Sequence, residues 1–143
     1  MKLAWTFCAI YACVILALTS APGEELTFIT QFGASDLVLH AIMYIPLALL
    51  VFRALSITYP DMPANRRWLY TVLACSAFGA LDELHQIPIP GRFCQFPDFV
   101  ADTVGVLLGA TGSMLYVRHG RRASEVTAPQ QPAATDRHRT DAS

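Results

Sequence analysis

The chain has 143 residues, enough for one domain, and it is 54% hydrophobic and only 15% charged. Soluble domains are usually about 45–50% apolar and about 25% charged, so this composition argues against a soluble globular protein. The net charge of −1, with basic residues scattered over short segments, argues against nucleic acid as a partner.

Residues 3–20 form the first apolar run, and no charged residue occurs between Leu3 and Gly23. About 18 or more apolar residues suffice to cross the hydrocarbon core of a membrane as a helix. Lys2, the apolar run and the small residues of "TSA" also fit a secretory signal peptide. The length of the run and the position of Pro22 favour a membrane span, with the signal peptide as the alternative.

Three further apolar runs, at about 35–57, 68–87 and 98–117, predict three more helices. Pro46 lies inside the second run, which membrane helices tolerate when neighbours satisfy the freed carbonyl. Residues 120–143 lack periodicity and aromatic side chains and are typical of disorder. The predicted fold class is therefore all-α. It is an integral membrane bundle of four transmembrane helices over residues 1–119, followed by a disordered cytoplasmic tail over 120–143.

The basic residues predict the orientation, because cytoplasmic loops are enriched in Lys and Arg. If the four spans alternate in direction, only Arg92 falls on one side. The other side receives Lys2, Arg53, Arg66, Arg67, Arg118, Arg121 and Arg122. We therefore expect both termini in the cytoplasm, and residues 21–34 and 88–97 on the outer side.

The ionisable residues within the last three runs are expected at one depth, near the outer boundary of the membrane. A charged residue in a span costs roughly 2.5–3.5 kcal/mol on insertion scales, so it normally faces the bundle interior or a wet cavity. Helical spacing places the polar residues of each run on one face, with His85 expected at the interface. The predicted inward-facing cluster consists of Asp36, His40, Asp82, Glu83, Gln86, Asp98 and Asp102.

Small residues in the fourth run are predicted to bring another helix close to it. They recur every four residues and form a small-xxx-small ridge of Ala101, Gly105, Gly109 and Ser113. The acidic residues beside this ridge should therefore face a packed helix rather than lipid. The same ridge offers a surface through which copies of the chain could form a homo-oligomer.

Carboxylates beside histidines are groups that general acid–base chemistry uses. We predict catalytic roles for Asp82, Glu83, His40 and Asp98, and ligand-binding roles for Arg92, Gln86, Asp36 and Asp102. Arg92 follows Pro90 and Gly91, a turn that can fold its side chain back onto the carboxylates or onto an anionic ligand. A lipid phosphate is the anion expected at this depth.

No metal site is predicted, although His with Asp or Glu suits zinc or manganese. The sequence contains no HExxH motif or comparable ligand spacing, and the four cysteines form no CxxC pair. No cofactor is indicated.

The segments "DLVLHAIMY" and "DELHQIPIPGRFCQFPDFVADTVGVLLG" resemble the VanZ-like membrane proteins. The resemblance covers about residues 26–117 and implies a small multi-helix membrane domain. It also implies a link to low-level resistance to the glycopeptide teicoplanin. Leu37 stands where the family usually has Lys, and Asp102 where it usually has Asn, which makes this site more acidic. The matching residues are Asp36, His40, Tyr44, Asp82, Glu83, Gln86, Pro90, Gly91, Arg92, Asp98 and Gly105.

Two functions follow from these patterns. The first is a bacterial inner-membrane protein whose outward-facing polar site binds or modifies a lipid-linked component of the cell envelope. Its partners would be membrane lipids and an envelope precursor. The second is a non-enzymatic structural or accessory module, in which the polar cluster only clamps the helices together.

Overall fold

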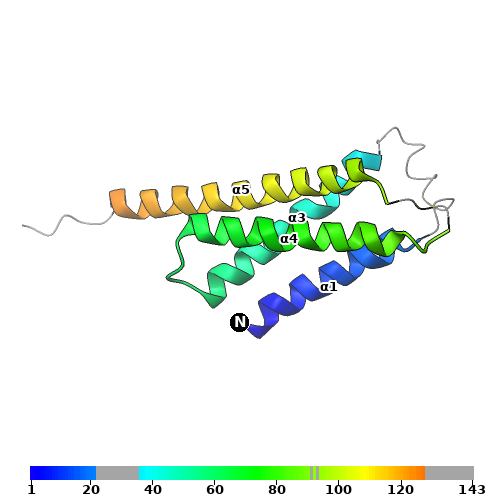
Figure 1. The fold of residues 1–143 in the computed structure, drawn as a ribbon. Coiled ribbons are helices and arrows are strands. Elements are labelled where there is room, and N and C mark those ends of the chain that lie inside the picture. Colours follow the sequence, from blue (N-terminus) through cyan, green and yellow to red (C-terminus); the bar gives the residue numbers. More distant parts are fainter. Residues whose placement is uncertain (22–35, 91, 93, 128–143) are drawn as a thin grey trace, which may run out of the picture.

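The computed structural model describes residues 1–21, 36–90, 92 and 94–127, without the side chains of Asp36 and of residues 121–127. In this part of the chain there are four helices and no strand (Figure 1). The all-α prediction is therefore confirmed. The helices are α1 (Lys2–Thr19), α3 (Asp36–Thr58), α4 (Ala64–Gln86) and α5 (Phe96–Thr127).

Successive helices run in opposite directions, and α3 packs against all three of the others (Figure 1). Two tryptophans join neighbouring helices at the end where α1 begins. Trp5 Nε1 donates to Thr58 Oγ1 at 3.0 Å, and Trp68 Nε1 donates to Thr111 Oγ1 at 3.1 Å. The opposite end of the bundle therefore gathers the last turns of α1 and α4 and the first turns of α3 and α5.

Of the four described helices, three contain a segment long and apolar enough to cross a membrane, namely Lys2–Thr19, Leu37–Thr58 and Phe96–Gly120. Helix α4 has 23 residues, as many as α3, but two arginines and two acidic residues lower its mean hydropathy. The predicted count of four spans is therefore not confirmed by length and composition. The difference lies in the polar ends of α4, which include Arg66, Arg67, Asp82 and Glu83.

In α4 the apolar side chains are exposed and the acidic ones are buried, which is the reverse of the pattern in a soluble protein. Leu81 is 63% exposed and Leu84 is 57% exposed, whereas Asp82 is 0% and Glu83 is 2% exposed. Soluble domains almost never bury Asp and Glu unless they are paired. Apolar side chains outside and carboxylates inside are the pattern expected of a helix surrounded by lipid.

Tight backbone contact joins α5 to α3. A Cβ added to Gly105 would overlap the carbonyl oxygen of Ala41, and one added to Gly109 would lie 2.6 Å from the carbonyl oxygen of Ile45. Ala101 is buried in the same ridge and Ser113 is half-buried. The predicted ridge is thus occupied by α3 of the same chain.

The helix bounds differ from the predicted spans at two places. Helix α4 begins at Ala64, four residues before the predicted start, and its Arg67 is buried. The Arg67 guanidinium donates to the carbonyls of Tyr59 at 3.2 Å and Pro60 at 2.5 Å, just after the C-terminus of α3. A cation is favourable near the negative end of a helix dipole, so Arg67 stabilises this turn as well as contributing to the charge asymmetry.

Helix α5 continues to Thr127, beyond the boundary near 120 where disorder was expected. Several residues after Gly120, including Arg121, Arg122, Ala123 and Glu125, are helix formers, which lets the helix continue past the membrane segment. The rest of the predicted tail, 128–143, lies outside the described residues.

The contact at Gly105 predicts a position-specific cost of adding a methyl group. Gly105→Ala should lower the free energy of unfolding by about 1–3 kcal/mol, because the added carbon has to displace the backbone of α3. Thermal or denaturant unfolding of the purified protein in detergent measures this change.

Gly112→Ala is the matched control, since a Cβ there meets nothing within 4 Å. It should leave stability unchanged or raise it by up to about 1 kcal/mol, because alanine is the better helix former. Equal destabilisation by the two substitutions would contradict the close α3–α5 contact.

Candidate functional site

The last turns of α1 and α4 and the first turns of α3 and α5 lie at the same end of the bundle (Figure 1). Polar side chains from all four helices meet there. This polar cluster is defined here as Thr19, His40, Tyr44, Asp82, Glu83, Gln86, Asp98 and Asp102, and each of these side chains is buried. Its residues lie in the last two turns of α1 and α4 and in the first three turns of α3 and α5. The structure therefore brings together most of the residues that the sequence places at a common depth.

His40 links α3 to α5. Its Nδ1 lies 3.0 Å from Asp102 Oδ1, and its Nε2 lies 4.0 Å from Asp98 Oδ2. Asp98 and Asp102 are four residues apart, so successive turns of α5 present both carboxylates to the same imidazole ring. An ionised carboxylate on Nδ1 favours a proton on that nitrogen, which leaves Nε2 as the atom directed toward Asp98.

Asp82 links α4 to α1 and α3. Thr19 Oγ1 donates to its Oδ1 at 2.7 Å, and the Tyr44 hydroxyl donates to its Oδ2 at 3.4 Å. The second distance is long, so the Thr19 bond is the stronger of the two. Gly79, one turn before Asp82, leaves room for Tyr44 and Asp102, which both lie within 3.4 Å of where its Cβ would be.

Glu83 links α4 to the segment that precedes α5. The backbone N–H of Gln95 donates to Glu83 Oε2 at 3.0 Å, and Gln86 Nε2 donates to Oε1 at 3.4 Å. A carboxylate that accepts a backbone N–H fixes that backbone relative to its own helix. Glu83 thus holds the entry to α5 against the end of α4.

Three ligand-type side chains of the cluster approach one another closely. One ligand atom each from His40, Glu83 and Asp98 lies within 4.8 Å of the other two. The three come from three different helices, so no local spacing in the sequence could indicate them. The sequence-based prediction of no metal site considered only motifs of neighbouring residues, so it could not detect a site built from three helices.

Two of the predicted ligand-binding residues, Arg92 and Asp36, have no described side-chain bond to the polar cluster. Arg92 turns toward α1, where its Nε donates to the carbonyl oxygen of Ala21 at 3.2 Å. Among the described residues it makes no salt bridge with Asp82 or Glu83, although its half-buried side chain lies at the same end of the bundle. The side chain of Asp36 and all of Gly91 lie outside the described part of the chain.

The two departures from the family motif have different surroundings. Leu37 is 42% exposed on the outer surface of α3. Asp102 is fully buried, and its Oδ2 has no hydrogen-bond partner within the described part of the chain. The additional carboxylate, Asp102, therefore lies within the cluster. Leu37, which replaces the usual lysine, lies on the outer surface of the bundle.

His85 is exposed, and its Nε2 lies 3.0 Å from Ser20 Oγ.

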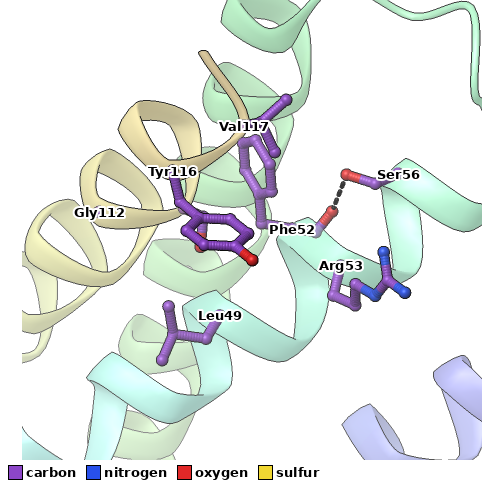
Figure 2. Close-up of a pocket in the computed structure, with 8 residues that line it drawn as sticks. Leu49, Phe52, Arg53, Ser56, Gly112, Tyr116 and Val117 are labelled. Carbon is purple, nitrogen blue, oxygen red and sulfur yellow. Dashed lines mark hydrogen bonds between the residues drawn. The ribbon is translucent and has the colours of Figure 1, made fainter. Parts of the chain in front are cut away.

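A groove of about 580 Å³ lies between α3 and α5, away from the polar cluster (Figure 2). Leu49, Phe52 and Arg53 line it from α3, and Gly112 and Tyr116 line it from α5. Its walls are mainly apolar. None of the predicted catalytic or ligand-binding residues lines it, and Ser113 is the one residue of the predicted packing ridge that does.

Thr19 and the Gln95 N–H are contacts that the sequence patterns did not indicate. Thr19 stands in the "TSA" stretch, which also fits the end of a signal peptide. An uncharged hydroxyl gives little signal in a hydropathy pattern. Its position in the last turn of an apolar run, at the depth expected for the acidic residues, is the feature that could have identified it.

A family model described as VanZ/LLP1 matches residues 3–117. The chain belongs to the VanZ/LLP1 family. The match includes α1 and reaches into α5, so the VanZ/LLP1 region contains every residue of the polar cluster. Neither the comparison with curated proteins nor the comparison with solved structures found a match.

Proposed function

We propose that this VanZ/LLP1 protein is a multi-pass protein of the bacterial inner membrane whose polar cluster binds or modifies a lipid-linked component of the cell envelope. The observation that carries the proposal is the burial of four carboxylates and a histidine at one end of a bundle with an apolar exterior. Intramembrane ionisable residues are costly and usually mark functional sites. The implied link to teicoplanin susceptibility is part of this proposal.

All four helices are proposed to cross the membrane. Helix α4 has 23 residues, which gives it a length of about 35 Å, against about 30 Å for the hydrocarbon core. Its carboxylates face the other helices rather than lipid, so its low hydropathy does not reflect polar groups that lipid would have to solvate. The packing of α1 on α3 and the bond from Thr19 to Asp82 support a retained first span rather than a cleaved signal peptide.

The proposed orientation places both termini in the cytoplasm and the polar cluster toward the outer side. The arginine asymmetry supports it, because the end of the bundle opposite the cluster carries most of the basic residues. The ligand would then reach the cluster from the outer leaflet. Arg92, the one basic residue of the outer loops, lies near that entrance and suits an anionic headgroup.

The second candidate function is a structural module in which the cluster clamps the helices. The observation that favours it is that bonds within the cluster join all four helices. They run from Thr19 and Tyr44 to Asp82, and from His40 to Asp102. Removing one partner of such a buried pair leaves an uncompensated charge or polar group, which is strongly destabilising.

Labelling of the native cysteines tests the proposed orientation. Cys94 is exposed in the loop beside the cluster, whereas Cys8 and Cys75 are buried and Cys13 lies on the lipid-facing side of α1. A membrane-impermeant maleimide should therefore label the protein in spheroplasts, and Cys94→Ser should remove the label.

Asp61→Cys, made in the Cys94→Ser chain, is the matched control because Asp61 is exposed in the turn between α3 and α4. It should react only after the membrane is permeabilised. Labelling of Cys94 only after permeabilisation would overturn the proposed orientation.

Glu83→Gln and Asp98→Asn distinguish a site from a clamp. Each keeps the shape of the side chain and removes its charge. For a ligand-binding site, we expect both variants to stay monodisperse in detergent with little change in melting temperature, yet to lose the effect of the protein on teicoplanin susceptibility. Susceptibility assays of a deletion strain complemented with each variant measure this.

Asp61→Asn is the control for removing one exposed carboxylate, and it should complement fully. Variants of Glu83 and Asp98 that unfold in detergent would favour the clamp. Folded variants that complement as well as the parent chain would contradict a role of the cluster in this phenotype.

A further inference from the structure

The geometry points to a metal site. We propose that His40, Glu83 and Asp98 together bind one divalent transition-metal ion, of the class that includes Zn²⁺ and Mn²⁺. The metal site itself depends only on the geometry of the cluster, whereas its use in ligand binding rests on the proposed function.

The three side chains already have the arrangement of a ligand set. One ligand atom from each lies within 4.8 Å of the others, and His40 Nε2 and Asp98 Oδ2 are 4.0 Å apart. Two ligands of one ion at about 2.0–2.2 Å can be separated by up to about 4 Å, so side-chain movements of less than about 1 Å would close the site. His40 and Glu83 are each 2% exposed and Asp98 is 6% exposed, so the site lies inside the bundle.

Asp102 orients the histidine for this role. Metal-binding histidines commonly hold the second ring nitrogen against a carboxylate, which fixes the tautomer and makes the metal-binding nitrogen more basic. Asp102 Oδ1 lies 3.0 Å from His40 Nδ1, on the side of the ring opposite Asp98. Asp102 is thus a positioning residue, which acts on the metal through His40.

The negative charge of the buried carboxylates gives an independent reason to expect a cation in the polar cluster. The polar cluster buries four carboxylates, and for Asp82, Glu83 and Asp102 no salt bridge to Lys or Arg occurs in the described part of the chain. Asp102 Oδ2 is buried and has no hydrogen-bond partner among the residues that the structure describes. Buried charges are normally paired or coordinate a metal, and one divalent ion would offset two of these negative charges.

The composition of the ligand set selects the class of ion. Oxygen ligands alone suit Mg²⁺ or Ca²⁺, whereas an imidazole nitrogen with carboxylates suits zinc, iron or manganese. Three protein ligands leave at least one coordination position open, as in catalytic rather than structural zinc sites. A phosphate oxygen of the proposed lipid-linked ligand, or a water, could occupy that position.

Metal binding can be measured on the full chain, purified in detergent without a histidine tag. After removal of metal with EDTA and equilibration with Zn²⁺ or Mn²⁺, mass spectrometry of the metal should find about one ion per chain. Bound Mn²⁺ should also give an electron paramagnetic resonance spectrum different from that of the free ion. Asp102→Asn should weaken binding by about 10–100-fold, because it acts through the histidine.

His40→Gln, Glu83→Gln and Asp98→Asn should each abolish stoichiometric binding. His85→Gln and Cys94→Ser, which change exposed ligand-type residues at the same end of the bundle, should leave it unchanged. If a charge-removing variant fails to fold, Glu83→Asp keeps the charge but withdraws the ligand atom, and it should weaken binding while the chain stays monodisperse.

A parent chain that binds neither ion, or binding that survives Glu83→Gln and Asp98→Asn, would overturn the metal site. Loss of binding on Cys94→Ser would assign the ion to the thiol and overturn it as well. If the parent chain binds metal but the Glu83→Gln and Asp98→Asn variants do not change teicoplanin susceptibility, the metal site stands. That result would contradict the proposed function alone.

Discussion

Gly105 lets the backbone of α3 lie directly against α5, and this contact brings His40 within 3.0 Å of Asp102. A side chain at position 105 would hold the two helices apart. The imidazole of His40 would then lose its carboxylate partners on α5, and Asp98 and Asp102 would lie against an apolar helix. Because lipid cannot solvate buried carboxylates, the close approach of α3 and α5 is the condition on which the polar cluster depends.

The antiparallel order of the helices brings the other residues of the polar cluster to the same end of the bundle. Since each helix reverses the direction of the one before, residues far apart in the sequence arrive at the same end of the bundle. Thr19 closes α1, Glu83 lies one turn from the end of α4, and Asp98 lies in the first turn of α5. Each of these residues contacts a residue of another segment, Thr19 to Asp82, Glu83 to Gln95 and Asp98 to His40, which explains how one cluster can hold the helices together.

Much of this arrangement could be predicted from the sequence. Apolar run length located the helices, and a period of 3.6 residues placed Asp82, Glu83 and Gln86 on one face of α4, where all three are buried. Orientation and ligand roles remain predictions. The contribution of α1 was missed, because Thr19 has no charge to distinguish it from its apolar neighbours.

Other features required three-dimensional information. Arg67 and Arg66 are adjacent and chemically identical in the sequence, yet only Arg67 is buried, since only its side chain reaches the carbonyls that follow α3. The direction of Arg92 depends on the end of α1, which no local pattern relates to residue 92. The triad of His40, Glu83 and Asp98 draws on three helices and therefore has no linear motif.

Helices α3 and α5 meet through a buried histidine–carboxylate pair, His40 and Asp102. A double-mutant cycle for unfolding in detergent, with His40→Gln, Asp102→Asn and the two combined, tests it most directly. We expect a coupling free energy of about 0.5–3 kcal/mol, because each substitution removes the same interaction. Changes that add to within about 0.3–0.5 kcal/mol would show that the two residues do not interact, and would contradict it.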